Sequence, residues 1–136
     1  MATTTQEALQ IGTIMPNFTV DDLQRSITFY EALGFKVDEK WEENGQLLGV
    51  MMRAGTSLIG LSQDDWKKGR DRKKGIGTRL MLSTTQIVDE IAKRAKAAGV
   101  TLKSEPHDTE WKSRAFEVAD PTGFLLTVYS EEKAKA

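Results

Sequence analysis

The sequence predicts an α+β fold made of two β-α-β-β-β repeats, whose eight strands form an open cup. The 136 residues suffice for one compact core, and strand-like alternation flanks a helical pattern twice along the chain. Gly34 and Gly99, 65 residues apart, each follow a helical pattern and precede an apolar strand start. Gly55 and Gly123, 68 residues apart, each open a last strand. A repeat of this length constrains the fold more strongly than a single motif does.

The first repeat begins with a strand and a helix. Residues 11–20 alternate as a strand, and Pro16 within them indicates an edge strand or a bulge, because proline cannot donate a backbone hydrogen bond. A helix follows from a cap at Asp21 or Asp22 to about Leu33, since a short carboxylate accepts the unpaired amide protons of a first turn.

Three further strands complete the first repeat, and we expect them at residues 35–43, 46–53 and 56–62. Alternation places Phe35, Val37 and Trp41 on one side of the first of these strands, so we interpret Trp41 as a packing residue. The dipeptide Asn44-Gly45 favours a hairpin, because both residues accept positive φ.

The second repeat shows the same order of patterns. We expect strands at residues 78–84, 100–105, 111–119 and 124–130, a turn at 121–123 and a helix over 86–98. Ile87, Ile91 and Ala95 form the apolar stripe of that helix. Each repeat thus gives a four-stranded sheet with one face covered by its helix, and the two remaining faces can form a concave ligand site.

The chain is organised as one domain with short flanking segments. We expect a flexible arm at residues 1–11, the domain at 12–130 and a C-terminal tail at 131–136. The repeats span about 12–62 and 77–130, and a charged loop at 63–76 joins them. The part of this loop from Asp64 to Gly75 holds six basic and three acidic residues. It is either a solvated loop or a mobile lid that contacts an anion beside a pocket.

Composition argues against several classes of function. The 19 basic and 20 acidic residues leave almost no net charge, which disfavours nucleic-acid binding. Cysteine is absent, which excludes disulfides, thiol catalysis and thiolate metal sites. The apolar runs are too short to cross a bilayer, and no signal-peptide pattern opens the chain. We expect a cytoplasmic protein that binds neither nucleic acid nor membrane.

Two segments carry a family resemblance. Residues 20–35, VDDLQRSITFYEALGF, and residues 111–128, WKSRAFEVADPTGFLLTV, resemble signatures of the glyoxalase/bleomycin-resistance/dioxygenase (vicinal oxygen chelate, VOC) superfamily. Lys112 stands where the second signature commonly has glycine. Together with the repeat, the resemblance covers residues 12–130. It implies the glyoxalase-like fold, in which two βαβββ units surround an open cup.

The resemblance also implies positions for a divalent cation, which metal-dependent members hold with His, Gln or Glu on the first and last strand of each half. Here these positions fall on Met15, on Ile59 or Gly60, on Arg79 or Leu80, and on Thr127. None is an ordinary ligand for Fe, Mn, Ni or Zn, and an arginine would repel a cation. The one histidine, His107, is expected in a solvated turn. The sequence therefore predicts no metal site and no cofactor.

Strand parity and residue type suggest eight ligand contacts. The inward-facing positions are Asn17, Thr19, Arg79, Met81 and Thr127. Arg79 either grips a carboxylate or phosphate with its planar fork or reaches water at the strand end. Trp66 and Trp111, in otherwise polar segments, each either stack a flat ligand or cover the core. Arg114 pairs either with the ligand or with an acidic neighbour.

Three functions remain open from the sequence. The first, implied by the resemblance to bleomycin-resistance proteins, is metal-independent binding of a small planar or anionic molecule in the cup. The second is a lyase, isomerase or dioxygenase reaction with an atypical or absent metal, for which Tyr30, Glu39 or Glu42 would supply acid–base chemistry. The third is a transcription-linked ligand sensor with a protein partner. No residue stands out as catalytic, and exposed sheet edges predict a homodimer.

Overall fold

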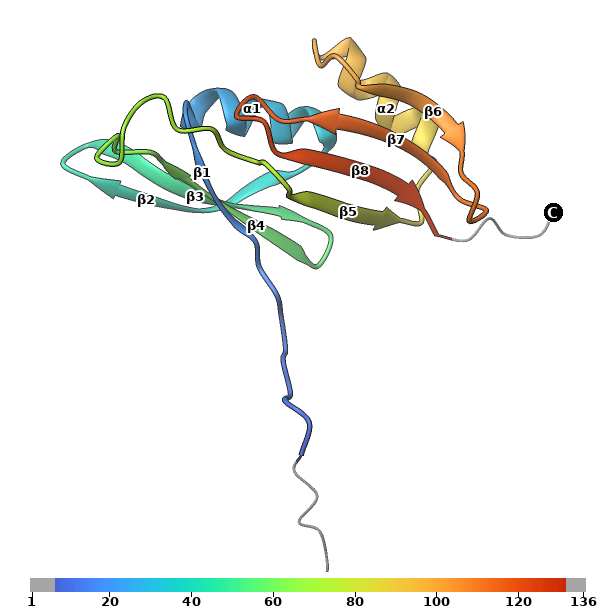
Figure 1. Cartoon of the computed structure of the whole chain (residues 1–136), viewed down its shortest axis with the longest axis horizontal. Helices are drawn as coiled ribbons and strands as arrows, with labels where there is room; N and C mark the ends of the chain where they lie inside the picture. Colours follow the sequence, from blue (N-terminus) through green and yellow to red (C-terminus); the bar gives the residue numbers. More distant parts are fainter. Residues whose placement is uncertain (1–6, 132–136) are drawn as a thin grey trace, which may run out of the picture.

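The computed structural model describes residues 7–131 and contains two halves with the same order of elements (Figure 1). The first half comprises β1 (Asn17–Val20), α1 (Leu23–Leu33), β2 (Lys36–Glu43), β3 (Gln46–Ala54) and β4 (Ser57–Gln63). The second half comprises β5 (Arg79–Thr84), α2 (Val88–Ala97), β6 (Ser104–Asp108), β7 (Arg114–Ala119) and β8 (Leu125–Ser130). The predicted α+β fold of two βαβββ units is confirmed.

Each half forms one open four-stranded sheet. The strand orders are β1-β4-β3-β2 and β5-β8-β7-β6, so the two sheets have the same topology. In each sheet the first strand runs parallel to the last, and the other neighbours are antiparallel. Figure 1 shows α1 above the first sheet and α2 behind β6 and β7 of the second sheet, and α1 contacts α2. In the described part of the chain, the helices therefore cover one face of each sheet and leave the other uncovered.

The ends of α1 are fixed by residues that the sequence identifies. The carboxylate of Asp22 accepts a hydrogen bond from the amide of Arg25 at 3.1 Å, which completes an N-cap. Gly34 follows the helix with φ at 112°, a left-handed conformation that residues with side chains rarely adopt. The predicted limits of this helix are confirmed.

The second helix is shorter than predicted. Its N-cap residue, Ile87, has an extended backbone and makes no side-chain capping bond. Ile87 is 68% exposed, so the expectation that it joins the apolar stripe is wrong. The buried residues of α2 are Val88, Ile91, Ala92 and Ala95. Neither helix within residues 7–131 is long and apolar enough to cross a membrane.

Aromatic rings and one buried carboxylate join the two halves. The rings of Phe18 in β1 and Phe124, just before β8, stack with centroids 4.0 Å apart and planes inclined by 8°. The hydroxyl of Tyr30 in α1 donates a hydrogen bond to Asp120 at 2.9 Å, and both residues are buried. The same carboxylate accepts backbone amides of the β7–β8 turn. These contacts hold α1 against the second half.

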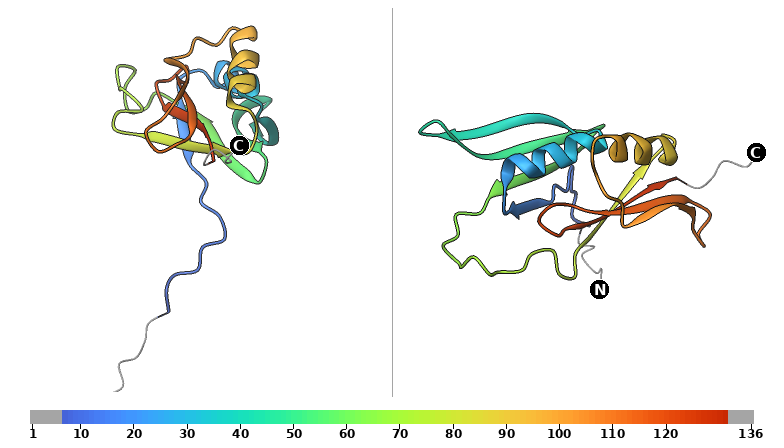
Figure 2. Two further views of the ribbon diagram at one scale, coloured as in Figure 1. Left: turned by 90° about the vertical axis from the view of Figure 1, so that its right-hand side faces the viewer. Right: turned by 90° about the horizontal axis from the view of Figure 1, so that it is seen from above.

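The first strand is shorter than the alternation predicts. Only the last four residues of the predicted strand 11–20 form β1. The carbonyl of Pro16 still accepts the amide of Gly60 at 2.8 Å, but the preceding segment leaves the sheet and extends away from it (Figures 1 and 2). Proline has no N–H to continue the pairing.

Two strand starts in the second half also differ from the prediction. β6 begins at Ser104, four residues later than predicted, and includes His107, for which the sequence predicts a turn. β7 begins at Arg114, so Trp111 lies in the β6–β7 turn and not in a strand. Lys112 lies in this turn with a left-handed backbone conformation, at a φ of 66°.

A bulge in β2 changes which face its later side chains occupy. The pairing of β2 with β3 shifts between Val37 and Glu39, which inserts Asp38 as an extra residue. Val37 packs against the core, whereas Trp41 lies beyond the bulge on the opposite face and is 46% exposed. The expectation that Trp41 shares a face with Val37 is therefore wrong.

Candidate functional site

Each sheet has one face that no helix covers within the described residues. The buried residues of β1 and β4 face α1, so the residues between them point to the opposite side. We define the first open face by Asn17, Thr19, Glu39, Trp41, Gly49, Met51, Gly60 and Ser62. By the same parity, the second open face consists of Arg79, Met81, Ser83, Ala115, Glu117, Leu125, Thr127 and Tyr129. Five of the eight predicted ligand contacts lie on these faces: Asn17, Thr19, Arg79, Met81 and Thr127.

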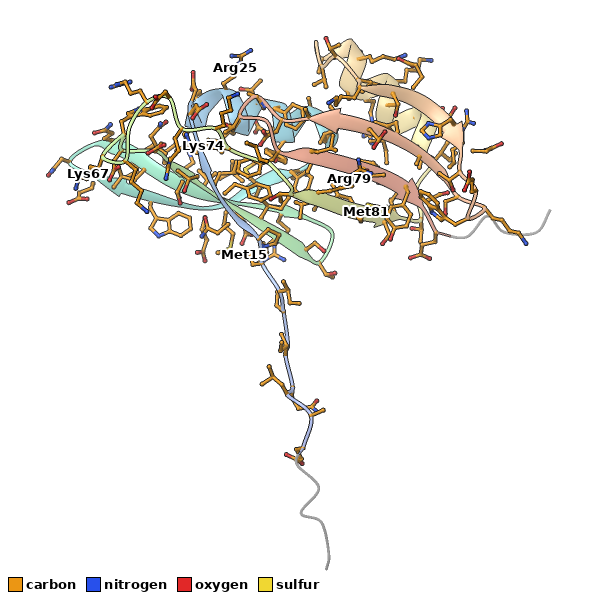
Figure 3. The ribbon with its side chains drawn as sticks, in the orientation of Figure 1. Met15, Arg25, Lys67, Lys74, Arg79 and Met81 are labelled. Carbon is orange, nitrogen blue, oxygen red and sulfur yellow. The ribbon has the colours of Figure 1, made fainter. Side chains whose placement is uncertain are left out.

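Arg79 provides a cation on the second open face. It lies at the start of β5, and its guanidinium is 3.2 Å from the carboxylate of Glu117 on β7 (Figure 3). Because β8 lies between these two strands, the arginine side chain crosses β8 to reach its partner. Both side chains remain partly exposed, at 50% and 30%. The arginine fork is thus accessible, and its carboxylate partner can be exchanged for another anion.

A hollow of about 430 Å³ lies at the Arg79 end of this face. Its lining consists of Gly75, Gly77, Thr78, Arg79, Lys103, Ala119, Gly123 and Leu125. Two cationic side chains, Arg79 and Lys103, therefore border one hollow. Sequence reasoning missed Lys103, because a single lysine in a strand-like segment carries no signal until the fold places it beside Arg79.

Thr127 is a buried polar residue at the centre of the second open face. It is 3% exposed, and its hydroxyl has no hydrogen-bond partner within the described chain. It pairs with Met81 of β5 on one side and with Glu117 of β7 on the other. A buried hydroxyl without a partner is unfavourable by about 1–3 kcal/mol. The centre of this face therefore has unused hydrogen-bonding capacity.

Met81 lies on the second open face and also borders a hollow between the halves. It is 48% exposed and lies close to Arg79 on the same strand (Figure 3). This second hollow has a volume of about 700 Å³ and is bordered by the end of α1, the β3–β4 turn, β5 and the start of α2. Its apolar lining includes Leu33, Phe35, Leu82, Ile91 and Val128. The flexible thioether of Met81 can adapt to an irregular apolar ligand there.

Backbone forms much of the centre of the first open face. Gly60 of β4 lies beneath the side chain of Asn17, since a Cβ on Gly60 would be 3.0 Å from the Asn17 Cγ. The Ser62 hydroxyl donates to the Asn17 Oδ1 at 3.4 Å. Thr19 pairs with Ser62 across the parallel strands and is exposed. The face thus has a flat floor with amide and hydroxyl groups along its β1 side.

Trp41 is a surface aromatic residue of this face that sequence reasoning assigned to packing. It pairs with Gly49 of β3, and a Cβ on Gly49 would lie 3.4 Å from the Cε3 atom of the indole. The ring therefore lies over a residue that has no side chain. The sequence feature that could have identified this exposed ring is a tryptophan opposite a glycine on the neighbouring strand. This pairing can be predicted only when the extra residue Asp38 is included in the register of β2 and β3.

The charged loop before β5 is anchored by a buried carboxylate. Asp64, which is 5% exposed, accepts hydrogen bonds from the Trp66 amide at 2.9 Å and from Arg72 and Lys74 at 2.8 Å each. Lys74 also contacts Asp21, just before α1 (Figure 3). The Lys74 hydrogen bond, followed by the Trp66 amide, holds the pKa of Asp64 well below its usual range. These contacts fasten the loop to the first half.

Three predicted ligand contacts lie away from the open faces. Trp66 lies within the charged loop, where the cationic groups of two loop side chains are 5.0 Å and 4.8 Å from its ring centroid. Trp111 is 55% exposed in the β6–β7 turn. Arg114 shares the helix-facing side of β7 with Phe116, and its guanidinium binds the Asp89 carboxylate of α2 at 2.9 Å and 3.0 Å. The structure does not bring these three residues to the open faces.

Tyr30 is inaccessible to a ligand. It is fully buried, and burial followed by the neighbouring Asp120 carboxylate raises its pKa far above the usual range. Of the other acid–base candidates, Glu39 lies on the first open face and Glu42 is exposed further along β2. The role of Tyr30 is therefore to join α1 to the second half.

The positions that the resemblance assigns to a metal ion carry an unsuitable set of side chains. Met15 precedes β1, and Gly60 has no side chain. Arg79 is a cation, and Thr127 offers a single hydroxyl. Among residues 7–131, no three His, Asp or Glu side chains gather as a metal-binding group. Because these metals prefer imidazole and carboxylate ligands, the four positions do not fit one.

A family model matches most of the sequence. It describes the Glyoxalase/Bleomycin resistance protein/Dioxygenase superfamily and matches residues 10–128. This match covers β1 to β8, apart from the last residues of β8. No curated protein matches the sequence.

Solved structures share the fold at low sequence identity. A hypothetical protein from S. aureus has a TM-score of 0.70 and 20% identity, covering 90% of this chain and 95% of its own. A superfamily member from Sphaerobacter thermophilus has a TM-score of 0.68 and 23% identity, covering 90% and 98%. A lactoylglutathione lyase from Agrobacterium tumefaciens has a TM-score of 0.64 and 18% identity, covering 89% and 94%. At these identities the similarity concerns the fold alone.

Proposed function

Because the chain belongs to the glyoxalase/bleomycin resistance protein/dioxygenase superfamily, we propose that it binds a small planar or anionic compound on its open faces without a metal ion. The observation that carries the proposal is the hollow bordered by both Arg79 and Lys103. A guanidinium binds a carboxylate or phosphate through two parallel hydrogen bonds, and an ammonium adds a point charge.

The present partner of Arg79 makes this exchange easy. The Arg79–Glu117 pair is partly exposed, and such pairs contribute only about 0–1 kcal/mol. A ligand anion that excludes water from the hollow forms charge-assisted hydrogen bonds worth about 1.5–3 kcal/mol. Loss of the Glu117 contact is therefore only a small penalty against ligand binding.

The test compares two arginines that both form ion pairs with carboxylates. A thermal-shift screen of small carboxylates and phosphates identifies a stabilising compound, because a ligand of the folded state raises its melting temperature. Arg79→Ala is expected to weaken binding of that compound by about 1.5–3 kcal/mol. The control Arg53→Ala is expected to leave its affinity unchanged. Equal affinity in the wild type and Arg79→Ala would reject the site. Stoichiometric Fe, Mn, Ni or Zn in purified protein would reject the metal-free mode and favour an enzyme.

We also propose that a second copy of the chain completes the site. The two open faces lie on the same side of the molecule, opposite the helices, so one chain covers a ligand from one side only (Figure 2). Strands β1, β2, β5 and β6 are sheet edges, and Leu9, Ile11 and Ile14 are 82%, 58% and 80% exposed. A homodimer covers edges and apolar side chains of this kind. Sedimentation is expected to give a dimer, and a 15.2 kDa monomer at micromolar concentration would contradict it.

A further inference from the structure

We infer that the first open face is a subsite for a flat, positively charged heteroaromatic ring, with Trp41 as its stacking surface. This inference rests on the proposed function, because it names the part of the ligand that the first open face recognises. Trp41 is 46% exposed although it lies within an eight-residue strand. The Cε3 atom of the indole lies against Gly49, and the exposed area of the ring is available to a second flat group.

Two glycines keep the surface beside Trp41 flat. Gly49 lies under the indole, and a Cβ added there would be 2.9 Å from the carbonyl oxygen of Leu61. Gly60, on the neighbouring strand, also lacks a side chain, and it pairs with half-buried Met51. The thioether of Met51 is polarisable and interacts favourably with aromatic rings. Because the indole lies against Gly49 and the Asn17 side chain covers Gly60, the surface that remains open to a flat ring is the exposed part of the indole.

The charge beside Trp41 selects a cation. Glu39 lies two residues before Trp41 on the same face and is in none of the ion pairs of the described residues, although its charge also acts on the nearby Arg53 guanidinium. The guanidinium of Arg53, further along this face, is bound by both carboxylate oxygens of Asp38 at 3.0 Å and 3.1 Å. An indole face attracts a cation through its quadrupole, and an unpaired carboxylate adds to that attraction. The second open face, with Arg79 and Lys103, has the opposite preference.

Hydrogen-bonding groups on β1 and β4 favour a ring with polar atoms on its edge. The Asn17 Oδ1 accepts from Ser62, and within the described chain its Nδ2 makes no hydrogen bond. The exposed hydroxyl of Thr19 lies on the same side of the face. A ring that stacks on Trp41 and extends towards β1 meets one free donor and two hydroxyls. A heteroaromatic ring uses these groups, whereas a hydrocarbon ring does not.

The experiment uses two planar probes of opposite charge. Proflavine, a heteroaromatic cation, and 2-naphthoate, an aromatic anion, are titrated by calorimetry into the wild type, Trp41→Ala, Trp111→Ala and Arg79→Ala. Trp41→Ala is expected to lower the affinity for proflavine roughly 5- to 10-fold, which is the range expected from stacking and cation–π attraction together. The control Trp111→Ala retains wild-type affinity for both probes. Arg79→Ala is expected to lower the affinity for 2-naphthoate and to leave the affinity for proflavine unchanged.

Further variants and outcomes separate the inference from the proposed function. Trp41→Phe, which keeps an aromatic face, is expected to lose less proflavine affinity than Trp41→Ala, and Glu39→Gln to reduce its salt dependence. Equal proflavine affinity in the wild type and Trp41→Ala overturns the inference, as does a Trp41→Ala variant that changes only the sedimentation of the dimer. Binding of 2-naphthoate through Arg79 without binding of proflavine overturns the inference and leaves the proposed function standing. Absence of binding by both probes at millimolar concentration overturns both.

Discussion

The two halves have one topology but differ at equivalent positions of their open faces. Aligning the buried residues of β4 and β8 places Gly60 of the first half at the position of Thr127 of the second. Gly60 has no side chain and is covered by Asn17, whereas Thr127 brings a buried hydroxyl beside Glu117. The buried residues that form the core between the sheets and the helices are apolar in both halves. The helix-facing side of each sheet thus maintains the fold, and the open side is free to differ.

Under the proposed function, this difference would give one scaffold two binding preferences. The first open face carries an exposed indole beside an unpaired carboxylate, at Trp41 and Glu39. The second has two cations bordering a hollow, at Arg79 and Lys103. A single ligand with a flat cationic part and an anionic part, or two different ligands, would satisfy both faces.

The halves also differ in how their turns are fixed, and Asp120→Ala tests this with the largest expected effect. The Asp120 carboxylate accepts three turn amides and the Tyr30 hydroxyl. Its removal leaves these buried donors unpaired, and we expect the free energy of unfolding in urea to fall by about 3 kcal/mol. The control is Arg53→Ala at the equivalent end of β3, where loss of a solvent-screened ion pair is expected to lower stability far less. Equal losses of unfolding free energy in Asp120→Ala and Arg53→Ala would contradict this difference between the turns of the two halves.

Tyr30→Phe sharpens the same comparison, because α2 has no counterpart of this hydroxyl bond. We expect a loss of about 2 kcal/mol, the range for a hydrogen bond to a charged group. The raised pKa of Tyr30 means that the folded protein keeps a proton that the unfolded chain releases above about pH 10. Its contribution to stability is therefore complete below about pH 10 and decreases as the pH rises further.

The measurement is denaturant unfolding of the wild type and Tyr30→Phe from about pH 8 to about pH 11. The wild type is expected to lose stability more steeply than the variant at the alkaline end. Tyr129→Phe, on the second open face, serves as the control for removing a tyrosine. An identical pH dependence in the wild type and Tyr30→Phe would show that the buried hydroxyl is not linked to folding.

Gly49→Ala tests whether the flat floor is specific to the first half. The new Cβ would lie 2.9 Å from the Leu61 carbonyl oxygen, so that β3 or β4 must shift. We expect a loss of about 1–2 kcal/mol in urea unfolding, as for a crowded core substitution. Gly60→Ala meets only the end of the Asn17 side chain and is expected to lose less. A stable Gly49→Ala protein would mean that the two strands can separate without penalty.

Chelation is expected to have the smallest effect. Neither half supplies a donor set for a metal ion at the positions implied by the family resemblance, so we expect no metal-binding energy to contribute to folding. Treatment with EDTA should leave the melting temperature unchanged in calorimetry. A drop of several degrees would reveal a metal site in one or both halves.

The sequence predicts the second open face better than the first, for a physical reason. Strands β5 and β8 pair without a register shift, so alternation alone places Arg79, Met81 and Thr127 correctly on one face. In β2 the extra residue Asp38 reverses the parity, and Trp41 changes face. A bulge depends on which hydrogen bonds two strands form, and the order of apolar residues does not record this.

The ends of the strands and the partners of charged residues are also hard to predict. Lys112 adopts a left-handed φ where the family signature commonly has glycine, so Trp111 lies in a turn although the segment around it alternates like a strand. Arg114 is bound by Asp89, 25 positions away on α2. Lys103 borders a hollow only because the fold brings it to Arg79. Such pairings depend on tertiary structure.

The anchored loop before β5 has a consequence for the integrity of the chain. Its two ends are tied together, since Asp64 after β4 binds Lys74 before β5, while the Lys67 side chain between them is exposed. A protease that cuts after Lys67 would break the covalent link between the halves without removing the Phe18–Phe124 stack that joins them. The cleaved protein would then persist as two associated fragments, each carrying one complete sheet and one of the two open faces.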